Sequence, residues 1–211
     1  MRPEQDPQVC ARLEAAVRGI AARSRTAVPI PWEHAHVLTD PGRVQPRVIA
    51  RLAGLCRRYG YVVSRSDLSE ISRAAGGHIL GATSSGLANG TGRKTVQLDR
   101  GMSPASEARV LAHETGHVIL GHTGLTPDQE IRALMKRIVA QAEDPAEEAA
   151  AELAAGAFCK VAGIGTGRFS PQFIWQKYRG QPVAEEAIHA GLLGARIIWA
   201  AAAPALERRA A

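Results

Sequence analysis

The sequence predicts an α+β fold in which a small sheet of about three strands packs on a mainly helical core. Two observations lead to this prediction. Several long segments repeat apolar residues at the spacing of a helix, and two short segments flank a loop rich in glycine, asparagine and serine, as hairpin strands do. With 211 residues, the chain is long enough for one main domain and an appendage.

Residues 1–45 are the expected appendage, and residues 46–211 are the expected main domain. Residues 8–24 place apolar side chains at helical spacing with arginines opposite them, which predicts a helix. The segment that follows contains several prolines and has no periodicity, which is typical of an extended arm. We expect this arm, which includes PIPWEHAH, to pack on the core, with coverage of a functional groove as the alternative.

The first half of the main domain is predicted to combine one helix with three short strands. The helix spans residues 46–59, and GYVVSR at residues 60–65 is predicted to be a strand. Residues 66–77 have the pattern of a capped turn or short helix. Residues 78–83 and 94–99 then form a hairpin around the loop SSGLANGTGR.

The second half is predicted to be helical. Ser103 followed by Pro104 is an N-cap with proline in the first turn, and Gly121 is a C-terminal stop, so a helix is expected over residues 104–120. Asp144 begins a capping-box pattern that predicts another helix. The capping box predicts a helix over residues 145–162. Two further segments with helical periodicity predict helices over residues 128–142 and about 183–202.

The composition predicts a soluble protein of the cytoplasm. The N-terminus lacks the apolar stretch of a secretory signal, and no window reaches about 18 continuous apolar residues. The apolar tail is interrupted by Arg196 and Pro204, which favours a buried helix over a membrane segment. Cys10, Cys56 and Cys159 form no C-x-x-C pair, and this sparse, odd number fits a reducing compartment.

Positive charge is concentrated near the N-terminus. Residues 1–66 hold 11 Lys and Arg against 5 Asp and Glu, while residues 67–211 hold 15 of each class. Such a basic region could contact nucleic acid or an acidic partner. Aromatic residues do not interleave with the arginines as a base-stacking platform requires, so solvated helix faces are the preferred interpretation.

The segment LAHETGH, residues 111–117, places two histidines and a glutamate among apolar neighbours, which are Val110, Leu111, Val118, Ile119 and Leu120. Residues four apart lie about 40° apart around a helix and about 6 Å apart along it, so His113 and His117 can face one ion. Glu114 lies about 100° around from His113 and flanks that ion. This H-E-x-x-H arrangement predicts zinc ligation by the histidines, with Glu114 as the catalytic base.

A catalytic zinc takes a third protein ligand, and the acidic segment after residue 142 is its expected source. Glu148 and Glu152 share one helical face, while Glu147 suits the helix cap. We expect Glu148 to be the ligand and Glu152 to accept a hydrogen bond from a ligand imidazole, although the exchanged assignment stays open. His122 lies about 140° around from His117 and is not expected to share the ion.

With these segments in order, the chain resembles the ImmA/IrrE-type metallopeptidases, including the metallopeptidase-like domain of ArdC-type antirestriction proteins. The resemblance covers roughly residues 46–175, through RLAGLCRRYGYVVSRSDL, the segment around LAHETGH, and EEAAAELAAGAFCKVAGIGTGRFSPQFI. It implies a minimal thermolysin-like (gluzincin) zinc fold with His113, His117 and Glu148 as ligands and Glu114 as base. It also implies a protein substrate such as a helix-turn-helix transcriptional repressor.

Two classes of function are consistent with these residues. The favoured one is an intracellular zinc-dependent endopeptidase, and the alternative is a non-catalytic, metal-stabilised regulatory or DNA-associated binding protein. The intact His-Glu-His pattern favours the enzyme, because a structural zinc site prefers a fourth protein ligand and does not need Glu114. A hydrolase also needs a donor for the oxyanion. Four unranked candidates are His78, His122, Arg168 and Tyr178.

Overall fold

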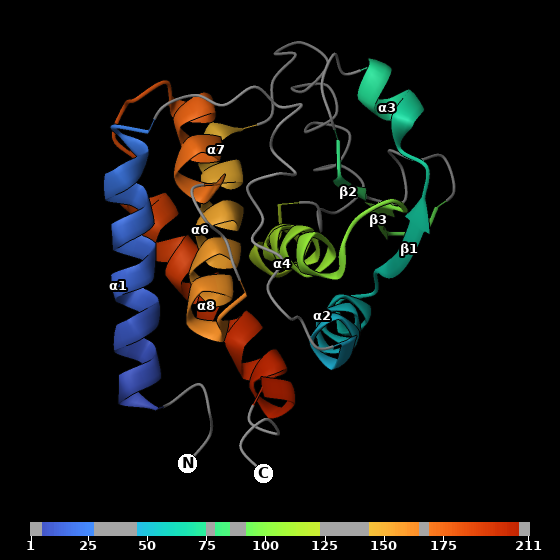
Figure 1. The fold of residues 1–211 in the computed structure, drawn as a ribbon, viewed down its shortest axis with the longest axis horizontal. Helices are drawn as coiled ribbons and strands as arrows, with labels where there is room; N and C mark the ends of the chain where they lie inside the picture. The colour runs from blue at the N-terminus through green and yellow to red at the C-terminus, as the bar shows by residue number, and fades with distance from the viewer. Residues whose placement is uncertain are drawn as a thin grey trace.

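The computed structural model describes residues 6–27, 46–74, 79–84, 92–122, 144–164 and 169–206. One helix, α4, runs through the middle, with the sheet and α2 on one side and α1, α6, α7 and α8 on the other (Figure 1). The elements are α1 (Pro7–Ser24), α2 (Pro46–Arg58), β1 (Val62–Ser66), α3 (Ser69–Ala74), β2 (Gly81–Ser84), β3 (Thr95–Asp99), α4 (Pro104–Leu120), α6 (Pro145–Ala162), α7 (Phe169–Tyr178) and α8 (Glu185–Leu206).

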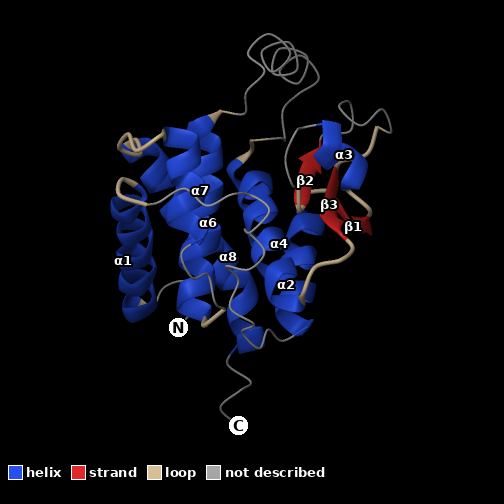
Figure 2. Cartoon of the chain, turned by 45° about the horizontal axis from the view of Figure 1, so that its top comes forward, coloured by secondary structure: helices blue, strands red, loops and turns tan. Residues whose placement is uncertain are grey.

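The described strands form one sheet in the order β1-β3-β2, at one side of the helical mass (Figure 2). β1 pairs parallel with β3, and β2 pairs antiparallel with β3, as the hairpin pattern predicted. Val96 and Leu98 of β3 are fully buried in the same apolar cluster as Leu111 of α4. The α+β prediction, with three strands on a mainly helical core, is therefore confirmed.

The ends of α4 are those that the sequence predicted. The Ser103 hydroxyl accepts a hydrogen bond from the backbone N–H of Ser106, and proline occupies the first turn. At the other end Gly121 adopts the left-handed conformation that glycine tolerates and that commonly ends a helix. The central helix is thus capped at both ends by local sequence.

Small residues let α4 and α6 approach closely. A Cβ atom at Gly116 would lie 3.0 Å from the Cα of Ala151, so no larger residue fits there without displacing one helix. The middle of α6 is built largely of buried alanines, including Ala150, Ala151 and Ala155. This close contact brings the polar side chains of α4 against the acidic residues of α6.

The other face of α6 is covered by α1, α7 and α8. Leu13, Val17 and Ile20 of α1 are buried in one cluster with Leu153 of α6 and Ala195 of α8. Helix α1 therefore shares a core with the helices that follow. The proposed domain boundary at residue 45 stays a prediction, because residues 28–45 lie outside the described part.

One described helix, α8, has the length and apolar composition to cross a membrane. Such a feature also occurs in core helices, and α8 buries Ala187, Gly191, Ala195 and Ile198 within the protein. Packing thus accounts for part of its apolar character. The helix expected at residues 128–142 and the arm carrying PIPWEHAH fall outside the described residues.

Candidate metal centre

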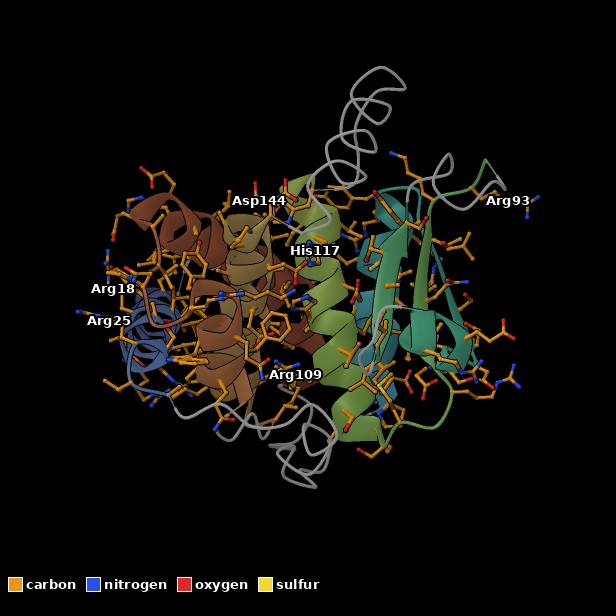
Figure 3. All side chains as sticks on the ribbon, turned by 90° about the horizontal axis from the view of Figure 1, so that it is seen from above. Arg18, Arg25, Arg93, Arg109, His117 and Asp144 are labelled. Carbon is orange, nitrogen blue, oxygen red and sulfur yellow. The ribbon has the colours of Figure 1, made fainter. Side chains whose placement is uncertain are left out.

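Three donor side chains meet between α4 and α6. The Nε2 atoms of His113 and His117 lie 3.1 Å apart. Glu148 of α6 completes the group, with one carboxylate oxygen 3.2 Å from His117 Nε2 and the other 3.6 Å from His113 Nε2. Figure 3 shows His117 on the side of α4 that faces α6, with Asp144 at the start of α6 nearby.

The spacing of these donors fits a metal ion. Ligands about 2.0–2.1 Å from a tetrahedral ion lie about 3.3 Å from one another, close to the separations observed here. The donor atoms of His113, His117 and Glu148 all lie within 4.8 Å of one another. Two imidazoles and one carboxylate are also a common donor set for catalytic zinc. The three residues could therefore hold a metal ion together.

The electrostatics of the metal-free cluster favour a cation between the donors. Burial disfavours the charged form of His113, but the carboxylates of Glu148 and Glu152 outweigh it and raise the pKa of His113 to about 10. Burial likewise opposes ionisation of Glu148, yet hydrogen bonds from His113 and His117 hold its pKa far below the usual range. A metal ion would take the place of this imidazolium proton.

Glu152 lies one turn after Glu148 and has a different set of partners. It is fully buried, and one of its oxygens accepts a hydrogen bond from the Arg109 guanidinium. Its other oxygen lies 3.1 Å from Nδ1 of His113. Burial opposes ionisation of Glu152, but the charge of Arg109 and the contact with His113 lower its pKa. The carboxylate can therefore orient the His113 ring.

Glu114 is on the same helix but is not one of the three converging donors. Its carboxylate is buried and accepts a hydrogen bond from the Thr83 hydroxyl of β2. At Gly81 the strand carries no side chain, and a Cβ atom there would lie 2.8 Å from a Glu114 oxygen. Glu114 thus lies against β2, an edge strand of the described sheet, and its role as a base stays a prediction.

Three contacts of the donor side chains were not predicted from the sequence. His122, which was not expected to share the ion, places its Nδ1 2.9 Å from Nδ1 of His117. From α7, the Phe173 ring packs edge-on against His113, and Lys177 Nζ lies 4.0 Å from a Glu148 oxygen. Gly121, as the residue that ends α4, could have indicated that the chain turns back and brings His122 to His117. No feature of the sequence indicated that α7 lies against the donor residues.

Two of the four candidate donors for the oxyanion, His122 and Tyr178, lie in the described part of the chain. His78 and Arg168 fall outside the described residues. Tyr178 ends α7, and burial together with the nearby charge of Asp144 raises its pKa. His122 is half-buried, and burial and the proximity of His117 lower its pKa to about 4.

Comparison with known families agrees with this geometry. The family model described as the IrrE N-terminal-like domain, a peptidase family, matches residues 56–159. The chain carries a domain of the ImmA/IrrE family. The matched segment contains all of α4 and most of α6, and with them each residue of the predicted site. No curated protein and no solved structure was found to match the chain. The family and the donor cluster together identify a metallopeptidase-like domain.

Proposed function

We propose that this ImmA/IrrE-family domain is a zinc-dependent intracellular endopeptidase that hydrolyses peptide bonds of another protein. The observation that supports this most directly is that the polar side chains of α4 lie in two separate settings. His113 and His117 converge with Glu148, while Glu114 on the same helix keeps a separate, buried carboxylate. By family analogy, a helix-turn-helix transcriptional repressor is the substrate class to test first.

In this proposal the Nε2 atoms of His113 and His117 and the carboxylate of Glu148 hold the zinc. When bound, zinc supplies Lewis-acid chemistry, since it lowers the pKa of water and polarises a carbonyl group. Glu152 fixes the ring of His113 by accepting its Nδ1–H, which leaves Nε2 free to act as a ligand. Arg109 keeps Glu152 ionised for that task.

Glu114 is the proposed general base and acid. Its carboxylate takes one proton from the attacking water as the water oxygen bonds to the peptide carbonyl carbon. It then gives that proton to the amide nitrogen as the carbon–nitrogen bond breaks. The products are an amine and a carboxylic acid, which releases its remaining proton to water to become a carboxylate. The Thr83 hydroxyl, hydrogen-bonded to Glu114, holds the carboxylate beside the edge of the sheet.

The test is cleavage by the zinc-loaded protein of an unfolded protein substrate and of purified helix-turn-helix repressors, with fragments read by mass spectrometry. Glu114→Gln should lower the cleavage rate by about 100- to 10,000-fold, because proton transfer contributes that much. Its zinc content should be unchanged. The matched control is Glu107→Gln on the same helix, whose side chain pairs with Arg65 and should leave cleavage intact.

Cleavage that survives in Glu114→Gln would contradict this mechanism. If the wild type binds zinc and cleaves none of these substrates, the non-catalytic alternative gains support. A cellular activity that needs His113 but tolerates Glu114→Gln would identify the domain as a metal-stabilised binding protein.

A further inference from the structure

The turn that ends α4 folds a third histidine back onto the metal centre. Gly121 has φ 77°, a conformation that side-chain-bearing residues rarely adopt, and its N–H donates to the carbonyls of His117 and Val118. The backbone N–H of His122 also donates to the His117 carbonyl, at 3.1 Å. The chain therefore reverses at Gly121, and His122 lies over the last turn of the helix.

The side chain of His122 meets the same residue as its backbone. The Nδ1 atoms of His122 and His117 lie 2.9 Å apart, and the ring centroids are 5.1 Å apart with the planes at 69°. At this separation one nitrogen donates a hydrogen and the other accepts it. The contact therefore couples the tautomers of the two rings.

The surroundings of His117 decide which nitrogen carries the hydrogen. Its Nε2 faces His113 Nε2 and a Glu148 oxygen, so Nε2 is the nitrogen that would offer a lone pair to a metal. A neutral imidazole with a lone pair on Nε2 carries its hydrogen on Nδ1. The acceptor for that hydrogen is Nδ1 of His122, since this is the atom within hydrogen-bond distance.

We propose that His122 is a positioning residue, which accepts the Nδ1–H of His117 and so fixes the tautomer and ring orientation that point Nε2 at the metal. This inference rests on the metal centre of the proposed function. It gives both imidazole ligands a partner, a carboxylate for His113 and a neutral ring for His117. Such outer partners commonly change metal affinity by about 10- to 100-fold.

The test measures the affinity of the full chain for Zn²⁺ alone, by competition with a fluorescent chelator. His122→Phe keeps a ring but removes the acceptor, and it should weaken Zn²⁺ binding by about 10- to 100-fold. His122→Asn offers an amide oxygen near the position of Nδ1 and should stay within about threefold of the wild type. The matched control, His189→Phe on α8, changes an exposed histidine and should bind as the wild type does.

Two further measurements separate positioning from packing. The visible spectrum of the Co²⁺-loaded protein should change in His122→Phe and not in His122→Asn, because ring orientation alters the coordination geometry. Gly121→Ala should also weaken Zn²⁺ binding, because it strains the turn while leaving His122 in the sequence. Gly121→Asn, which tolerates the left-handed conformation better, should weaken it less.

Three outcomes would overturn the inference. The first is a Zn²⁺ affinity of His122→Phe equal to that of the wild type. The second is an equal loss of Zn²⁺ affinity in His122→Phe and His122→Asn. The third is no Zn²⁺ uptake by the wild type. The proposed peptidase fails in a different way. A wild type that binds Zn²⁺, responds to His122→Phe as stated and cleaves no protein would contradict the peptidase while supporting the role of His122.

Discussion

Two polar clusters lie between α4 and α6, and they neutralise their buried charge in different ways. In one, His113 and His117 surround Glu148. In the other, one turn further along α6, Glu152 pairs with the guanidinium of Arg109, which is only 3% exposed. Figure 3 labels Arg109 and His117 at different heights along α4, both on the side that faces α6.

The difference shows why two equivalent acids on one helix face have different roles. A buried carboxylate is costly unless a positive group compensates it, and Arg109 is a permanent cation supplied by the protein itself. Both oxygens of Glu152 are engaged, one by Arg109 and one by His113 Nδ1. Both oxygens of Glu148 instead face imidazole Nε2 atoms, where a metal ion can replace protons.

The largest effect expected from this comparison is on metal content. Glu148→Ala removes a proposed ligand and should weaken Zn²⁺ binding by more than about 100-fold, beyond the usual effect of outer partners. Elemental analysis of the purified variant, beside Glu152→Ala, measures it. The exchanged assignment, with Glu152 as ligand, would be correct if Glu152→Ala loses the metal and Glu148→Ala keeps it.

A second, smaller effect on metal binding should accompany a loss of stability. Glu152→Gln leaves Arg109 buried without its anion, which should cost about 3–5 kcal/mol of the free energy of unfolding of the metal-free protein. Zn²⁺ affinity should fall by about 10- to 100-fold because His113 loses its acceptor. Chemical denaturation and chelator competition measure the two quantities separately.

The control for this pair is the double variant Arg109→Met with Glu152→Gln. It removes the unpaired charge and should regain part of the lost stability, without regaining Zn²⁺ affinity. If Glu152→Gln alone is as stable as the wild type, the Arg109–Glu152 pair does not carry the charge compensation described above.

The pH dependence of the metal-free protein tests the Glu148 cluster. The pKa of His113 in the folded protein is about 10, above its ordinary value of 6.5. The contribution of His113 to the free energy of unfolding is therefore complete below pH 6.5 and is lost as the pH rises toward 10. Because folding lowers the pKa of Glu148, its ionised carboxylate stabilises the fold above pH 4.5, the ordinary pKa of the group. This stabilisation is lost in acid. The unfolding free energy should therefore fall from about pH 6.5 to pH 10.

Urea denaturation of the metal-free protein across this range measures the trend. His113→Gln removes the titrating ring and should flatten the slope. Zn²⁺ affinity should change in the opposite direction and rise with pH, because binding displaces the proton from His113. A metal-free protein that gains stability over the same range would contradict the charge arrangement in this cluster.

The smallest effect concerns the cation at the edge of the cluster. Lys177 Nζ lies 4.0 Å from a Glu148 oxygen and is partly exposed, so its repulsion of a bound metal is screened by solvent. Lys177→Met should raise Zn²⁺ affinity by only about two- to fivefold. Lys160→Met, at the exposed far end of α6, is the matched control. A fall in affinity would mean that Lys177 supports Glu148 rather than competing with the metal.

Local sequence determined much of this protein. Ser103, Pro104 and Gly121 set the limits of α4, and Asp144, Pro145 and Gly163 set those of α6, because caps act through neighbouring backbone atoms. The H-E-x-x-H spacing likewise fixed which side chains of α4 share a face. The hairpin pattern located β2 and β3 for the same local reason.

Only the tertiary structure decided which groups meet across elements. It placed Arg109 against Glu152, Thr83 against Glu114 and Lys177 beside Glu148, pairs separated by 29 to 43 positions in the chain. Helical periodicity says which face a residue occupies but not the depth or rotation at which two helices dock. That docking follows from close packing at Gly116 and Ala151, and it determines which of two identical acids can serve a metal.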